Sequence, residues 1–237
     1  MVKSEVRVLP SDDVTIGDFS ITDFISEHGY PVETHKGIQT FDGYLLDVHR
    51  IPHGKSNGND SRLPVVLLMH GLVGSSENWI LLGPDKSLAF LLADEGYDVW
   101  MGNARGNKHS RKHINFDPDK DSQYWMFSWH EIGVYDLPAI IDYILKKTGN
   151  RKLMYVGHSQ GTTTFFVMAS EKPQYNRYIK VMAALAPVAF MSKGLGPLMQ
   201  LVSLSLSGIS VSSKLYRIVR LKYLSFIKLT CRADSQW

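Results

Sequence analysis

The feature that most constrains the fold of this chain is a serine between an apolar run and a helix-like run. Residues 153–157 are mostly apolar, Gly157-His158-Ser159-Gln160-Gly161 follows, and residues 162–168 continue with threonine, phenylalanine, valine and methionine. Glycines two positions on either side of the serine are typical of a strand-to-helix turn whose backbones approach too closely for a β-carbon. The pattern predicts a strained turn that lifts the Ser159 hydroxyl clear of a sheet. The Gln160 N–H would then lie at a helix N-terminus, where it can stabilise an oxyanion.

This turn alone has two interpretations, since a capping serine on an ordinary strand-to-helix turn fits the same pattern as a nucleophile. A second stretch favours the nucleophile. The apolar run 63–69 predicts a strand buried on both faces, as in a parallel sheet, and it ends at His70-Gly71-Leu72. The turn at its carboxyl end would set the Leu72 N–H beside the Gln160 N–H. Together the two donors would form an oxyanion hole for acyl transfer.

Around these two stretches, apolar strands alternate with amphipathic helices. Two strands flank the hairpin signal Phe41-Asp42-Gly43, and helix and strand patterns alternate after it. We expect strands at 33–40, 44–50, 97–101 and 178–186, and helices at 87–95, with Leu88, Leu91 and Leu92 on one face, and at 131–147. This order predicts an α/β fold with a doubly wound, mostly parallel sheet and an N-terminal hairpin.

Several short motifs together resemble one family. They are Asp42-Gly43-Tyr44, Arg50-Ile51-Pro52, His70-Gly71-Leu72, Asn78-Trp79-Ile80, residues 96–100, Asn103-Ala104-Arg105-Gly106-Asn107, residues 135–139, residues 157–163 and residues 184–188. Spread over residues 22–189, they resemble the acid lipases of the α/β-hydrolase fold, whose lysosomal and gastric members cleave triacylglycerols and cholesteryl esters. The resemblance implies a lipase or carboxylic ester hydrolase that acts at a lipid–water interface, with Ser159 as nucleophile and without a cofactor or metal. It also implies a secreted or lysosomal protein.

Charge and composition exclude some alternatives. The 237 residues are 44% hydrophobic and 21% charged, with a formal charge of +3. Residues 190–237 alone carry +6, so the preceding part is acidic by about three charges and lacks the general basic face of a nucleic-acid-binding protein. The single cysteine, Cys231, allows no internal disulfide. The loop with Arg105, Lys108, His109 and Arg111 is expected to be solvated and basic rather than a metal or phosphate site.

The two ends of the sequence lead to separate expectations. Residues 1–21 are polar, with no signal peptide visible, so the chain would be cytosolic if translated as given. We expect a hydrolase core at 22–190, and a cap remnant with a basic apolar tail at 191–237. Residues 194–213 are uncharged but too rich in serine and glycine for a transmembrane span, and residues 216–229 fit either a cap remnant or a membrane-surface helix.

The catalytic triad is incomplete in this sequence. In the family the order is serine, acid, histidine, yet all nine histidines precede Ser159, and Asp234 is the only later aspartate. His70 and His158 are expected to be structural. We therefore expect a truncated isoform that lacks the C-terminal strands and most of the cap and is inactive or very weak. The alternatives are a non-catalytic lipid-binding or interfering isoform and an unstable product with no function of its own.

Overall fold

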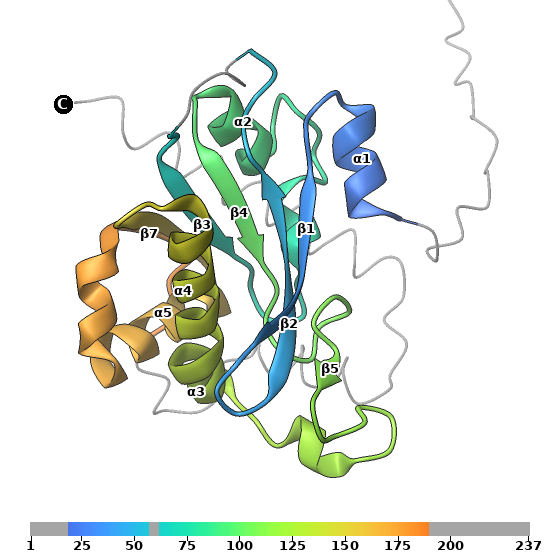
Figure 1. Ribbon diagram of the computed structural model, residues 1–237, viewed down its shortest axis with the longest axis vertical. Helices are drawn as coiled ribbons and strands as arrows, with labels where there is room; N and C mark the ends of the chain where they lie inside the picture. The colour runs from blue at the N-terminus through green and yellow to red at the C-terminus, as the bar shows by residue number, and fades with distance from the viewer. Residues whose placement is uncertain (1–18, 57–61, 190–237) are drawn as a thin grey trace, which may run out of the picture. The chain divides into compact units, whose positions relative to one another are not determined.

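The computed structural model describes residues 19–56 and 62–189 (Figure 1). Its elements in chain order are α1 Ile21–Glu27, β1 Glu33–Gln39, β2 Tyr44–Ile51, β3 Val65–Met69, η1 Ser76–Trp79, α2 Leu88–Asp94, β4 Asp98–Gly102, β5 Lys112–His113, η2 Ser122–Trp125, α3 Trp129–Glu131, a π-helical turn Ile132–Asp136, α4 Leu137–Thr148, β6 Leu153–His158, α5 Gln160–Glu171, η4 Pro173–Tyr178 and β7 Ile179–Leu185. The predicted strands and both predicted helical regions are present, with ends that differ by a few residues.

The strands form one mixed sheet in the order β1-β2-β4-β3-β6-β7, with β5 paired to the start of β2. β4, β3, β6 and β7 are parallel, whereas β1 and β2 form an antiparallel hairpin and β2 runs antiparallel to β4. The predicted mostly parallel sheet with an N-terminal hairpin is therefore confirmed. The carboxyl ends of β3, β4 and β6 meet at one edge of this sheet, which we call the carboxyl edge.

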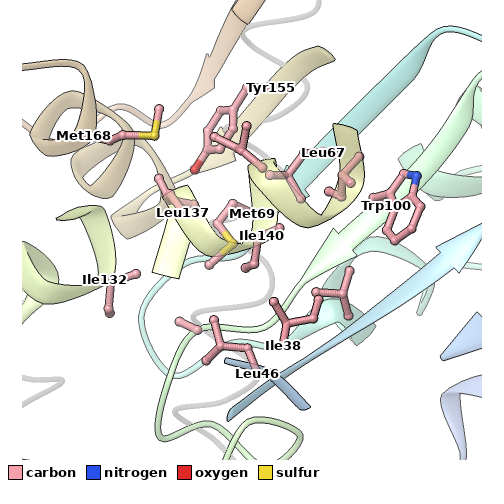
Figure 2. Packing of buried hydrophobic residues seen from close by; sticks show 14 of the residues in the cluster. Ile38, Leu46, Leu67, Met69, Trp100, Ile132, Leu137, Ile140, Tyr155 and Met168 are labelled. Atoms are coloured by element: carbon pink, nitrogen blue, oxygen red, sulfur yellow. The ribbon is translucent and has the colours of Figure 1, made fainter. Parts of the chain in front are cut away.

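Successive side chains of a strand point to opposite faces of the sheet. Because helices cover both faces, the residues of β3 contribute alternately to two cores. Leu67 and Met69 face α4 and α5 in a core that also holds Trp100, Ile140 and Tyr155 (Figure 2). The alternate residues of β3 belong to a second core, which is formed with the short helices α1 and α2; its members include Val66, Leu68, Ile25 and Phe90. All five residues of β3 are buried, as its continuous apolar run predicts.

Two details of the predicted helices were wrong. In α2 the fully buried side chains are Ala89, Phe90 and Ala93; Leu88 and Leu92 are partly buried and pack against the core as predicted, whereas Leu91 is exposed. The segment 131–147 is not one continuous α-helix. The π-helical turn runs directly into α4 and places Pro138 near its start, where the wider turn accommodates a residue that has no backbone N–H. Gly149 ends α4 at φ +68°, as predicted.

The predicted region 191–237, with its uncharged stretch and its amphipathic segment, lies outside the described residues, as does nearly all of the predicted extension 1–21. Within residues 19–56 and 62–189, none of the helices has the length and apolar character needed to cross a bilayer.

Candidate active site

Ser159 occupies the turn between β6 and α5. Its backbone has φ 51° and ψ −114°, a sparsely populated region that costs on the order of 1–3 kcal/mol for a residue with a β-carbon. Neighbouring bonds hold it there: the Ser159 N–H donates to the Leu185 carbonyl (2.9 Å), and its own carbonyl accepts from the N–H and the hydroxyl of Thr162 (2.9 and 2.6 Å). The predicted strained turn is therefore present, and strain of this kind is a feature of functional sites.

The flanking glycines are required by close packing. A β-carbon on Gly157 would lie 2.7 Å from the Gly161 carbonyl oxygen, and one on Gly161 would overlap the Met69 carbonyl. The second contact shows that α5 starts directly against the carboxyl end of β3. Any larger residue at either position would push the helix away from the sheet and would displace the turn that carries Ser159.

The predicted oxyanion turn lies against Ser159. Because Met69 of β3 pairs with Gly157 of β6, the chain leaves both strands at the same level of the sheet. A β-carbon on Gly71 would be 3.2 Å from the Ser159 Cβ and 3.0 Å from the His158 Nδ1. Gln160 is the first residue of α5, so its N–H has no partner within the helix. The structure thus brings Gly71, the neighbour of Leu72, against Ser159, the residue before Gln160, and the catalytic roles of Leu72, Ser159 and Gln160 stay predictions.

His70 has a structural role, as expected. It is buried, one ring nitrogen hydrogen-bonds the Gly71 carbonyl (Nδ1···O 2.7 Å), and the other accepts from the Ala104 N–H (3.1 Å). This arrangement requires the neutral tautomer with the proton on Nδ1. Burial lowers the pKa of His70 to about 4, although the bond to Gly71 acts in the opposite direction. His158 is half-buried, and burial lowers its pKa as well.

The depressed pKa of His70 predicts a loss of stability in acid. The unfolded chain takes up a proton near pH 6.5, whereas folded His70 does so only near pH 4, so acidification between these values favours unfolding. We expect His70 to contribute a loss of about 3 kcal/mol over this window. Urea unfolding of the chain and of His70→Gln at pH 7 and pH 4.5 should show a smaller loss for the variant. Equal losses for the two proteins would contradict the assigned protonation.

Side chains from the loop after β4 hold the oxyanion turn from the other side. The Asn103 Oδ1 accepts from the Ser76 N–H (2.9 Å) and from the Asn107 Nδ2 (2.8 Å). Asn107 also lies 3.2 Å from the His70 Nε2, and Glu77 pairs with Lys108 (2.6 Å). The roles of Asn103, Asn107 and Glu77 could not be predicted from the sequence, because only the fold brings their loops together. A cavity of about 410 Å³ opens here, lined by Val73, Gly74, Ser75, Glu77, Asn78, Leu81, Asn107 and Lys108.

The expectation of a solvated basic loop was wrong for Arg105, which is buried. Its guanidinium binds Asp136 (Nε···Oδ1 2.8 Å) and both carboxylate oxygens of Asp42 (2.5 and 2.9 Å), and it lies 3.9 Å from the centre of the Tyr44 ring. The two carboxylates outweigh burial and raise the pKa of Arg105. The Arg105 backbone N–H also donates to Asp136 (2.9 Å). Asp42, Arg105 and Asp136, here called the Arg105 cluster, connect the hairpin, the loop after β4 and the start of α4.

In the part of the chain that the structure describes, His, Cys, Asp and Glu side chains form no group of three or more able to hold a metal ion. The described residues after Ser159 include neither histidine nor aspartate, and Asp234 lies outside them. Among the described residues, the chain that follows Ser159 therefore supplies no histidine or aspartate to act as the general base, which the α/β-hydrolase order places after the serine.

Comparison with known proteins shows the family of the chain. The family model described as "alpha/beta hydrolase fold" matches residues 64–208, and the model described as "Partial alpha/beta-hydrolase lipase region" matches residues 21–83. The chain belongs to the α/β-hydrolase family and, by its lipase region and its relatives, to the acid lipases within it.

Individual relatives show how much of the chain is similar and at what sequence identity. Gastric triacylglycerol lipase of Bos taurus is 54% identical over 171 residues, which are 72% of this chain and 43% of the relative. Lipase 3 of Drosophila melanogaster is 52% identical over 174 residues, 73% of this chain and 44% of the relative. The chain thus spans less than half the length of these relatives. Among solved structures, an epoxide hydrolase from Vigna radiata aligns with a TM-score of 0.44 at 19% identity, over 73% of this chain and 44% of that one.

Proposed function

We propose that this chain carries the nucleophile and oxyanion hole of a lipase, a carboxylic ester hydrolase that acts on neutral lipids such as triacylglycerols and cholesteryl esters. The observation that carries the proposal is the strained Ser159 turn (φ 51°) with Gly71 packed against it. In this assignment the Ser159 hydroxyl attacks the ester carbonyl. The Leu72 and Gln160 N–H groups stabilise the oxyanion of the tetrahedral intermediate. The name of the bovine relative supports triacylglycerols as substrates. Cholesteryl esters and a secreted or lysosomal compartment are proposed from the resemblance to the acid lipases.

A base must accept the proton that Ser159 loses, and the 237 residues place no histidine after it. Both ring nitrogens of His70 are engaged in hydrogen bonds, and its pKa of about 4 makes it a poor proton acceptor. We therefore propose that the 237-residue chain by itself is at most a very weak hydrolase. A non-catalytic lipid-binding or interfering role is the second candidate, and the missing base is the observation that favours it.

A fluorophosphonate probe separates these two candidates. The probe phosphorylates serines whose surroundings stabilise a developing oxyanion. We expect slow labelling of the folded 237-residue chain that is confined to Ser159, located by peptide mass, and absent from Ser159→Ala. Ser61 and Ser207 lie in sequence contexts without the glycine pattern and serve as internal controls. An adduct-free Ser159 in a folded chain would favour the non-catalytic candidate instead.

A further inference from the structure

Several exposed apolar side chains lie on the hairpin turn and on the segment 114–129 that follows β5. They are Phe41, Ile114, Trp125, Met126 and Trp129, here called the aromatic patch. Phe41 is 95% exposed and Met126 79% exposed, so neither contributes to the core. Side chains of this size are normally buried, and a group of them on the surface indicates a binding site.

The aromatic patch is built on a fixed framework. The Ile114 N–H donates to the Gly43 carbonyl (2.9 Å), which joins it to the hairpin turn. The Trp125 ring lies against Gly106, where a β-carbon would be 3.0 Å away, and its indole N–H donates to the Pro118 carbonyl (2.9 Å). The Phe41 ring stacks on Tyr135 with 6.4 Å between ring centres. These bonds hold the backbone while leaving apolar surface in solvent.

The sheet register places the hairpin turn, which carries Phe41, beyond the carboxyl edge of the sheet, at the same end as the Ser159 turn. β2 runs antiparallel to β4 with His49 opposite Met101, so the start of β2 and the hairpin turn extend past the carboxyl end of β4. Ser159 follows the carboxyl end of β6, which is three strands away from β2 in the order β2-β4-β3-β6. Three strand spacings are roughly 15 Å. Figure 1 shows the hairpin turn, β5 and α3 at the same end of the sheet.

Charge next to the patch identifies the kind of surface that it fits. The loop 111–121 carries three basic and three acidic residues, so its formal charge is zero. Arg111 pairs with Asp119 and Lys120 with Asp117, each at 2.7 Å. A surface that attracts anionic lipid or nucleic acid needs an excess of basic side chains, which this loop does not have. Tryptophan and methionine with balanced charge fit an uncharged interface instead.

We propose that the aromatic patch binds the surface of a neutral lipid particle covered by zwitterionic phospholipid. This inference rests on the proposed lipase function, because docking through the patch would set the carboxyl edge, with Ser159 and the oxyanion turn, facing the ester groups. The apolar side chains enter the boundary between headgroups and acyl chains, and the Trp125 N–H stays bonded to Pro118 while the rest of the ring is buried in lipid.

The test is flotation of the 237-residue chain with triolein emulsions coated with phosphatidylcholine. We expect the chain to float with the emulsion, and Phe41→Glu and Met126→Glu each to lower the partition coefficient about tenfold, since each places a charge in the apolar boundary. Leu91→Glu is the matched control. Leu91 is an exposed leucine on α2, which leads to the opposite end of β4, so this variant should float like the parent.

Other outcomes overturn the proposal. It is wrong if Met126→Glu and Leu91→Glu float equally, if flotation requires anionic lipid and disappears in high salt, or if Met126→Glu merely converts a dimer of this chain into monomers. Ser159→Ala separates this proposal from the proposed function. The variant should float normally, so a chain that floats but is never labelled at Ser159 contradicts the lipase and leaves the lipid surface in place.

Discussion

Replacement of Arg105 by methionine is expected to destabilise the fold by about 3–5 kcal/mol, the usual result of removing one partner from a buried ion pair. Asp136 is fully buried and its carboxylate receives the Arg105 guanidinium and backbone N–H, so the variant would leave that charge with one remaining donor. Small domains have free energies of unfolding of about 5–15 kcal/mol, and this loss removes a large part of that. Urea unfolding followed by circular dichroism measures it as a lower midpoint at unchanged slope.

The control for this prediction is Arg111→Met, which breaks an ion pair of similar length at the surface. Arg111 contacts Asp119 at 2.7 Å, and both side chains are solvent-accessible. Exposed pairs of this kind are worth less than about 1 kcal/mol. The double variant Arg105→Met with Asp136→Leu should recover part of the lost stability, because it removes the unpaired buried charge. If Arg105→Met were no more harmful than Arg111→Met, the assignment of Arg105 as the central ion of the cluster would be wrong.

The Ser159 turn could be predicted from the sequence because its signals are local. The whole signal lies within 20 residues. The two glycines indicate a close approach of backbones, the serine marks the strained turn, and the apolar runs indicate burial. The alternation of apolar strands and helices similarly predicted the parallel sheet, since buried strands and amphipathic helices differ in period. The packing of Gly71 against Ser159 then followed from two neighbouring parallel strands that end at the same level.

The Arg105 cluster could not be predicted in this way. Asp42, Arg105 and Asp136 are separated by 63 and 31 residues, and each belongs to a different short motif. An arginine in a polar loop is usually solvated, so a local interpretation placed Arg105 in solvent. The buried face of α2 was mispredicted for a related reason. Leu88, Leu91 and Leu92 have helical spacing, but only Leu88 and Leu92 pack against the core, and the fully buried face is that of Ala89, Phe90 and Ala93.

The largest effect that we expect is in ester hydrolysis. The 237-residue chain should hydrolyse p-nitrophenyl butyrate only marginally. Both ring nitrogens of His70 are engaged in hydrogen bonds, its pKa of about 4 makes it a weak base, and the sequence has no histidine after Ser159. Loss of the histidine in a serine hydrolase lowers turnover by about a millionfold, and the oxyanion hole and substrate binding retain roughly a thousandfold over water.

Fusion of the chain to the segment that follows the aligned region in the bovine gastric triacylglycerol lipase should therefore raise kcat/KM by about 10⁵-fold or more, because that segment is where the α/β-hydrolase order places the acid and the histidine. The gain should vanish in the Ser159→Ala fusion and persist in a Ser207→Ala fusion, since Ser207 is not in the Gly157–Gly161 turn. Steady-state rates of the parent chain, the fusion and both variants measure this gain.

Strong turnover by the 237-residue chain alone that disappears in Ser159→Ala would show that one of the upstream histidines serves as the base. A folded fusion without activity would instead locate the defect in the Ser159 turn or the oxyanion turn themselves, because every other group that the reaction needs would then be present.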